Sequence, residues 1–113
     1  MSATLEGDTI IMGMSALVRR EVRARFAKVD AFDVEHLLEA TQLPFLEEPN
    51  RRRERDRVHL AILKLANGDF ERAARSLAQA ASDWRDVLVE AGLANEDWPE
   101  VLRGAGFPVP RAD

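Results

Sequence analysis

The two histidines are the side chains whose spacing best suggests acid–base or metal chemistry in this 113-residue chain. His36 lies three residues before Glu39, and His59 lies three residues after Asp56. An acid and a histidine on neighbouring helical turns can supply two metal ligands, or a base and the group that orients it. No HExxH motif and no third ligand accompany either pair, so a structural role for each histidine is the simpler interpretation. A small metal-dependent enzyme that uses both histidines is the third of three functional hypotheses.

Other catalytic motifs do not occur in the sequence. The chain has no cysteine, which removes thiol nucleophiles, disulfides and cysteine-ligated metals together. None of its serines lies in a G-x-S-x-G motif, and no glycine-rich phosphate loop is present. Glu47 and Glu48 are adjacent on a proline-bounded segment and need not face one substrate. We therefore predict a protein that is not an enzyme and that holds no cofactor and no metal.

An arginine-rich run, RRRERDR at positions 51–57, is the one local anomaly. Cations at the N-terminal end of a helix are disfavoured by the helix dipole, so something must offset their charge. One explanation is pairing with the acids of the run itself and with Glu47 and Glu48. The other is an anionic partner, either an acidic protein surface or a phosphate backbone. If the run binds an anionic partner, the residues predicted to make the contact are Arg51, Arg52, Arg53, Arg55 and Arg57.

Charge and composition limit the partners and the compartment. The formal net charge of −4 disfavours nucleic acid as a partner, and no aromatic residue interrupts the arginine run to stack on bases. The apolar share of 46% and the charged share of 32% are typical of a globular protein. No apolar run is long enough to span a bilayer, and the N-terminus lacks the basic region of a signal peptide. These features predict a cytoplasmic protein without a membrane partner.

The elements that must position these residues are all helical. Apolar residues recur at helical spacing from Met14 through Val29, and a second helix follows with Asp30 or Asp33 as its cap. An apolar connector at 43–50 leads to a central helix, capped by Asn50, whose arginine-rich turns are expected to project beyond the core. Three further helices are expected at about 69–82, 83–91 and 97–104. The expected caps are Asp69 for the first, Ser82 or Asp83 for the second and a residue of 95–97 for the third, and glycines end the last two.

No segment alternates with a period of two, so no sheet is expected. The prediction is an all-α, compact bundle of five to six helices in a single domain, residues 1–113. Residues 1–8 are expected to form a flexible leader, with translation starting at Met1 or Met14, and residues 107–113 a tail. The sequence leaves open whether the two histidines, or the arginine run and a second run at 19–25, converge in space.

Two decapeptides near the C-terminus are nearly alike, DWRDVLVEAG at 83–92 and DWPEVLRGAG at 97–106. Each encodes a short helix with an acidic cap, a tryptophan in the first turn and a glycine at the end. A period of 14 residues is too short for a stacking repeat. We interpret the likeness as a packing solution used twice, with Trp84 and Trp98 as large buried side chains.

Residues 58–88, VHLAILKLANGDFERAARSLAQAASDWRDVL, resemble a family of small, uncharacterised bacterial α-helical proteins. The pattern that carries the resemblance is LAILKL-x-x-GD followed by DWRDVL. The resemblance implies a bacterial source and an all-helical fold, and it assigns no catalytic residue. A weaker likeness, from Gly68 to Ala80, is to a single tetratricopeptide-type helix hairpin, although no second unit follows at that repeat's period.

These observations favour a non-catalytic function. The first hypothesis is a small protein-interaction or regulatory module of unknown process, whose partner is a protein of unknown identity and which can also associate with itself. The second is an accessory nucleic-acid-binding protein that uses the arginine-rich run 51–57.

Overall fold

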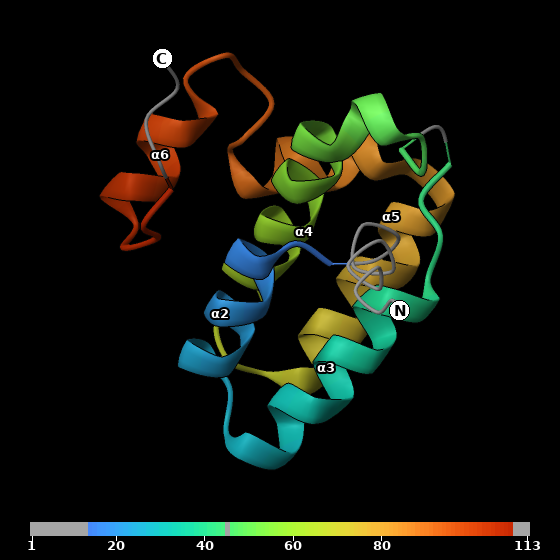
Figure 1. The fold of residues 1–113 in the computed structure, drawn as a ribbon. Coiled ribbons are helices and arrows are strands. Elements are labelled where there is room, and N and C mark those ends of the chain that lie inside the picture. Colours follow the sequence, from blue (N-terminus) through green and yellow to red (C-terminus); the bar gives the residue numbers. More distant parts are fainter. Residues whose placement is uncertain (1–13, 45, 110–113) are drawn as a thin grey trace, which may run out of the picture.

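The fold is known from a computed structural model that describes residues 14–44 and 46–109. Within these residues the chain forms helices and no strand. The helices are α2 (Ala16–Arg25), α3 (Lys28–Ala40), the short 3-10 helix η1 (Pro49–Arg51), α4 (Arg52–Ala66), α5 (Phe70–Ala91) and α6 (Trp98–Gly104). The prediction of an all-α bundle of five to six helices is confirmed for this part of the chain (Figure 1).

Helix α4 is the central element of the bundle. Six consecutive residues, Val58–Leu63, are buried, so more than a full turn of α4 is covered on every side. Its most extensive packing is against α5, and α2 also contacts it (Figure 1). One hydrophobic core contains residues of all five α-helices, as the central position predicted for Val58–Ala66 requires.

The expected capping residues are confirmed at both ends of α5 and at the C-terminal end of α4. The Asp69 carboxylate accepts a hydrogen bond from the backbone N–H of Arg72 at 3.0 Å, as predicted for the N-terminus of α5. Helix α4 ends in left-handed backbone at Asn67, and Gly68 follows with a φ of 84°. Gly92 ends α5 with a φ of 78°. Glycine adopts these conformations without steric cost, which explains why it stands at both ends.

The boundary between the first two helices differs from the prediction. Phe26 and Ala27 have extended backbones, so α2 ends at Arg25 and α3 begins at Lys28. Neither Asp30 nor Asp33 caps α3, because the cap position is Ala27. The break keeps Phe26 in the core and brings Val29 to the surface. A continuous helix through Val29 would have buried that side chain, and the periodicity alone did not reveal the break.

Two further expectations are wrong. Asn50 does not cap α4, because residues 49–51 form η1, in which the N–H of Arg51 bonds to the carbonyl of Glu48 at 2.9 Å. Residues 107–109 are not a tail, because Phe107 and Val109 are buried in the core. The remaining tail residues, 110–113, and the expected leader at 1–8 lie outside the described residues.

The C-terminal decapeptides form helices, as expected: the first forms the last part of α5, after a kink at Asp83, and the second forms α6. Helix α5 bends at Asp83, whose φ of −153° is not helical and whose carboxylate accepts a hydrogen bond from the N–H of Arg85. Trp98 is buried in the first turn of α6. Trp84 is only partly buried, and its indole N–H donates to the carbonyl of Pro44 at 3.1 Å. Both tryptophans therefore pack on the core, one of them at its edge.

Candidate functional site

The arginine-rich run divides into an exposed part and a part used within the fold. Arg51, Arg52 and Arg53 are exposed. Arg55 is only 4% exposed, and its guanidinium lies 3.1 Å from the carboxylate of Glu47. The expectation that the arginine-rich turns project beyond the core is therefore wrong for Arg55. Whether the run binds a partner stays a prediction.

Arg55 and Glu47 fasten the connector between α3 and α4. The second carboxylate oxygen of Glu47 accepts a hydrogen bond from the backbone N–H of Leu43 at 2.8 Å. Leu43 and Leu46 on this connector are fully buried, as predicted, whereas Phe45 lies outside the described residues. A buried guanidinium is tolerated when it is paired and hydrogen-bonded, and Glu47 provides the pairing.

Arg57 holds the segment between α5 and α6 against α4. Its guanidinium donates to the carbonyls of Leu93 at 2.9 Å and Asn95 at 3.4 Å, and it pairs with Glu54 at 3.2 Å. It also lies 5.6 Å from the centre of the Trp98 ring. Arg57 thus makes internal contacts with several of its donors, so a structural role is sufficient to explain it.

The second arginine run, at 19–25, is also largely paired within the chain. Arg23 makes a two-point contact with Glu35 of α3, at 2.7 and 3.3 Å, and this contact raises the pKa of Arg23. Arg19 lies 2.7 Å from Glu39 of the same helix. These pairs tie α2 to α3. Two of the four arginines of this run, Arg19 and Arg23, therefore join two helices.

The histidines occupy different environments. His36 is exposed on α3, where its ring contacts the Phe32 ring in a tilted arrangement with centroids 4.4 Å apart. His59 is 1% exposed in the middle of α4, and neither of its ring nitrogens has a hydrogen-bond partner within the described residues. Burial, followed by the charge of Arg55, lowers the pKa of His59 to about 3. His59 is therefore neutral at pH 7.

The metal-site hypothesis gains no geometric support. Across residues 14–44 and 46–109, no three His, Cys, Asp or Glu side chains are grouped so that they could hold a metal ion. Asp56, the acid near His59 in sequence, is half-buried, and desolvation raises its pKa against the opposing effect of a hydrogen bond with Ser15. Asp56 is therefore hydrogen-bonded to Ser15, the residue that precedes α2.

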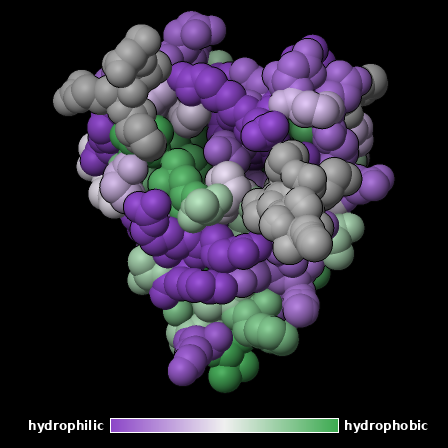
Figure 2. Space-filling model, in the orientation of Figure 1, coloured by the Kyte–Doolittle hydropathy of each residue, from purple (hydrophilic) through white to green (hydrophobic). Residues whose placement is uncertain are grey.

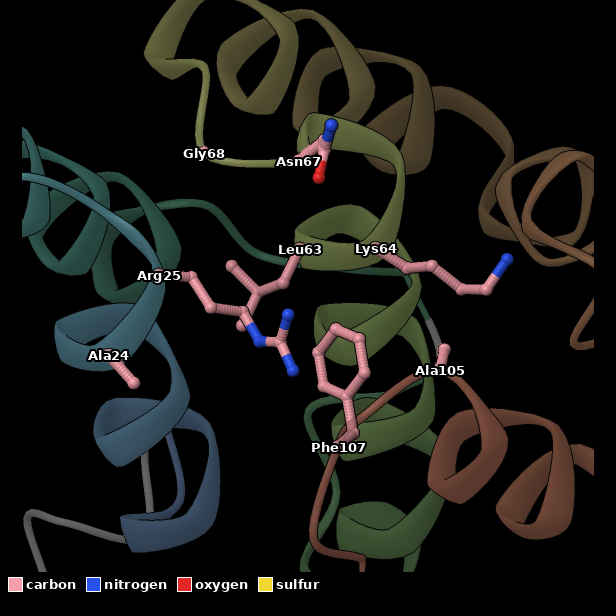
Figure 3. A pocket seen from close by; sticks show the side chains of 8 residues that line it. All are labelled: Ala24, Arg25, Leu63, Lys64, Asn67, Gly68, Ala105 and Phe107. Carbon is pink, nitrogen blue, oxygen red and sulfur yellow. The ribbon is translucent and has the colours of Figure 1, made fainter.

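A polar hollow of about 390 Å³ lies where the C-terminal ends of α2, α4 and α6 meet (Figure 3). Its lining residues are Ala24, Arg25, Leu63, Lys64, Asn67, Gly68, Ala105 and Phe107. The guanidinium of Arg25 lies over the Phe107 ring at 3.5 Å and donates to Glu21 and to the carbonyl of Gly106, each at 2.9 Å. Figure 3 shows that the Lys64 side chain extends away from Arg25, and its ammonium donates to the carbonyl of Ala91 at 2.9 Å.

Arg25 therefore has a structural role in this hollow. A cation is favoured near helix C-termini, where the carbonyl ends of the helix dipoles point. Arg25 links the end of α2 to the segment after α6, and Arg103 donates to the carbonyl of Val109 at 2.8 Å, so both arginines help to hold residues 107–109 against the core. Its buried partner Glu21 compensates its charge. Arg25 and Lys64 both donate to acceptors of the fold, so the hollow is a structural junction.

The most unusual surface is an apolar corner between α2 and α3. Val29 is 74% exposed and Phe32 is 63% exposed; among the large apolar residues described, only Val89, at 67%, is comparably exposed. Beside them lies a hollow of about 520 Å³, lined by Arg23, Phe26, Lys28, Ala31, Phe32 and Glu35. Figure 2 shows apolar surface gathered at the lower tip of the molecule, where the α2–α3 turn lies in Figure 1. We call Val29, Phe32 and this hollow the apolar corner.

The break between α2 and α3 creates the apolar corner. Because the chain turns at Phe26 and Ala27, the first turn of α3 extends past the end of α2. The Arg23–Glu35 pair borders the hollow and fixes the separation of the two helices. Lys28 lies at the rim, is exposed, and makes no ion pair within the described residues. Sequence reasoning missed this site because it assigned Val29 to the buried stripe and did not single out Phe32.

Comparisons with protein-family models, with curated proteins and with solved structures find no match for the chain. The resemblance of residues 58–88 to a bacterial helical family therefore stays a prediction. No helix of the described residues is both long and apolar enough to cross a membrane.

Proposed function

We propose that the chain is a small, non-catalytic protein-interaction module that docks on a partner through the apolar corner. The observation that supports this most is the exposure of Val29 and Phe32 beside a hollow of about 520 Å³. Neighbouring apolar side chains that a fold leaves in water, next to a concave surface, are characteristic of docking sites. A cytoplasmic location, inferred from the sequence, belongs to the same proposal.

The chemistry of the corner defines the partner segment. Phe26, Ala31 and Phe32 line the hollow and would take one large apolar side chain. Lys28 at the rim makes no ion pair within the described part of the chain, so an acidic group next to that apolar side chain would complete the contact. The partner is therefore a protein segment that presents an apolar residue with an acid beside it.

A selection from a random-peptide display library tests this proposal. The bait is the full chain, with counter-selection on the double variant Val29→Ser/Phe32→Ser. A matched control is Val89→Ser, because Val89 is 67% exposed but lies on α5. Enriched peptides should carry a large apolar residue and an acid, bind wild type and Val89→Ser equally, and bind the double variant at least tenfold more weakly. Peptides that bind all three proteins alike, or no enrichment at all, would contradict the proposal.

Nucleic-acid binding through the exposed arginines is the alternative. Arg51, Arg52 and Arg53 are consecutive and exposed, and Arg53 lies 4.7 Å from the centre of the Trp98 ring. Arg55 and Arg57 are engaged within the fold, which reduces the charge available to phosphates. A salt titration of binding to generic duplex tests this alternative. Phosphate contacts would give affinity that falls steeply with added salt, and no binding at low salt would eliminate it.

A further inference from the structure

The turn between α4 and α5 is built on an Asn–Gly pair, Asn67 and Gly68. Both residues have a positive φ, of 48° and 84°, and the N–H of Asp69 donates to the carbonyl of Ala66 at 3.0 Å. These are the features of a type I′ β-turn, for which Asn–Gly is a preferred central pair. Figure 3 shows both residues at one side of the polar hollow that they line. Solvent reaches the turn, because Asn67 is exposed.

The peptide unit that joins Asn67 to Gly68 makes no hydrogen bond to the described residues. Neither the carbonyl of Asn67 nor the N–H of Gly68 has a partner among them, although the N–H of Asn67 donates to the carbonyl of Leu63 at 3.1 Å. The carboxamide of Asn67 also has no partner within residues 14–44 and 46–109. Rotation of this one peptide plane therefore breaks no hydrogen bond in the described part of the chain.

That rotation leads to a geometry in which Asn67 can close a ring on Gly68. Attack by the Gly68 nitrogen on Cγ of Asn67 forms a five-membered ring, so Cβ and this nitrogen must lie on the same side of the Cα–C bond. In an L-residue this requires a ψ of about −120°, the value at the first central position of a type II′ turn. Asn67 has a ψ of 44°, which keeps the nitrogen on the far side.

A type I′ turn becomes a type II′ turn when its central peptide plane turns over. The positive φ of the first central residue and the hydrogen bond across the turn are common to both types. Asn67 already has that positive φ, and the bond from Asp69 to Ala66 can persist through the change. The reactive geometry is thus one peptide rotation away from the observed one.

We propose that Asn67–Gly68 is a site of spontaneous deamidation. The Gly68 nitrogen loses its proton to hydroxide and attacks Cγ of Asn67, where a C–N bond forms. The Cγ–Nδ2 bond breaks, and Nδ2 takes a proton from water and leaves as ammonia. Water then opens the cyclic imide at either of its two carbonyls. The products are an aspartate at position 67, or an isoaspartate in which the main chain runs through Cγ. The site is independent of the apolar corner.

The chain contains two internal controls for this reaction. Asn50 and Asn95 are its other asparagines, and both are exposed. The residues that follow them are Arg51 and Glu96, whose side chains restrict the backbone and shield the nitrogen that would attack. Glycine has no side chain, so the reaction at Asn67 should be much faster than at the other two positions.

The isoaspartate product should weaken the junction of α2, α4 and α5. It adds one main-chain methylene to a two-residue turn of fixed length. A Cβ at Gly68 would lie only 3.1 Å from the backbone oxygen of Arg25, so the turn is already close to the end of α2. The aspartate product should keep the turn, because aspartate, like asparagine, tolerates a positive φ. Asn67→Asp reproduces this product and separates the effect of the charge from that of the longer main chain.

Peptide mapping of the folded, full-length protein after several weeks at 37 °C and pH 7.4 tests the proposal. Trypsin places the three asparagines in separate peptides, with Asn67 in residues 65–72. The mass gain that replaces a carboxamide NH2 by OH should accumulate there at least tenfold faster than at Asn50 or Asn95. An isoaspartate-specific methyltransferase should label part of this product. The rate should rise about tenfold from pH 7 to pH 8, because the deprotonated nitrogen is the nucleophile.

Two variants test the role of the following glycine. Gly68→Ala should slow the reaction at Asn67 at least tenfold. Glu96→Gly leaves the turn between α4 and α5 intact and gives Asn95 a glycine neighbour, so it should accelerate deamidation at Asn95 at least tenfold and leave Asn67 unchanged. The second variant keeps the test valid if Gly68→Ala does not fold.

An unchanged mass of residues 65–72 in the folded protein overturns the proposal. If the same residues then deamidate in urea, the turn holds the peptide plane fixed, which contradicts the proposed rotation. Deamidation at Asn50 or Asn95 as fast as at Asn67 also overturns it, as does a Glu96→Gly variant in which Asn95 reacts no faster. A rate that does not depend on pH would exclude the cyclic imide.

Discussion

Phe32 and His36 are in ring contact one helical turn apart on the exposed face of α3, with centroids 4.4 Å apart and the rings tilted by 39°. Both side chains lie outside the core, and Val29 precedes Phe32 on the same face. The contact gives His36 a packing role beside the apolar corner. The contact between α2 and α3 does not depend on Phe32 or His36, because ion pairs of Arg19 with Glu39 and of Arg23 with Glu35 join the two helices.

Phe32 should contribute little to folding, whereas Phe26 should contribute a great deal. Phe32→Ala removes a ring that is 63% exposed, and the free energy of unfolding should change by less than about 1 kcal/mol. Phe26→Ala removes a buried ring six residues earlier and should cost about 3 kcal/mol or more. Urea unfolding of the two variants checks the contrast. A loss of stability in Phe32→Ala as large as in Phe26→Ala would show that Phe32 belongs to the core.

Arg55 and Arg51 should differ in their effect on stability although both belong to the same run. Arg55→Met breaks a buried contact with Glu47 and should lower the free energy of unfolding by about 2 kcal/mol. Arg51→Met alters an exposed side chain and should change it by less than about 0.5 kcal/mol. The measurement is chemical denaturation at pH 7. Equal effects of the two substitutions would mean that the Arg55–Glu47 contact does not stabilise the fold.

His59 should make the protein sensitive to acid. Its pKa is lowered in the folded state to about 3 from an ordinary value of 6.5, so below about pH 6.5 the unfolded chain binds a proton that the folded chain does not. This difference should lower the free energy of unfolding by roughly 3 kcal/mol between pH 7 and pH 4. The protein therefore loses this part of its free energy of unfolding as the pH falls from 6.5 towards 3.

The variant His59→Leu isolates this effect from the titration of the carboxylates. Urea unfolding at pH 7 and pH 4 should show a smaller acid-induced loss for the variant than for wild type, by about 3 kcal/mol. Asp56, whose pKa is raised, is present in both proteins and cancels in the comparison. Parallel pH profiles for the two proteins would contradict the burial of a neutral histidine at this position.

Replacing glycine by alanine should have opposite effects on stability at two helix ends, Gly68 and Gly104. A Cβ at Gly68 would lie 3.1 Å from the backbone oxygen of Arg25, and the φ of Gly68 is 84°. Gly68→Ala should therefore cost about 1–2 kcal/mol. Gly104 ends α6 with nothing within 4 Å of an added Cβ, so Gly104→Ala should be neutral or slightly stabilising. Thermal melts of both variants test this, and a tolerated alanine at position 68 would show that the two helix ends do not approach so closely.

Much of the fold could be predicted because local physics decides it. The all-apolar run around Val58 identified the central helix, and Asp69, Gly68 and Gly92 marked helix ends through capping chemistry. The break at Phe26 could not be predicted, because the apolar spacing continues across it to Val29. That one boundary determines whether Val29 is in the core or at the surface, so the apolar corner was missed with it.

The candidate site depended on contacts between distant residues, which spacing does not specify. The arginine run looked uniform in sequence, but Glu47 and the carbonyl of Leu93 engage two of its members and leave Arg51, Arg52 and Arg53 exposed. Phe107 is likewise buried in the core and contacts Arg25, 82 positions earlier in the chain. A chain segment that lacks helical periodicity can be part of the core when such a partner exists.

The most direct test is a titration of the ¹⁵N-labelled wild-type protein with a peptide selected on it, followed in two-dimensional ¹H–¹⁵N spectra. If the apolar corner is the docking surface, the amide signals of residues 28–36 should shift progressively as peptide is added, while those of Arg51, Arg52 and Arg53 stay fixed. Shifts confined to residues 51–53, or no shift at residues 28–36, would contradict the apolar corner as the docking surface.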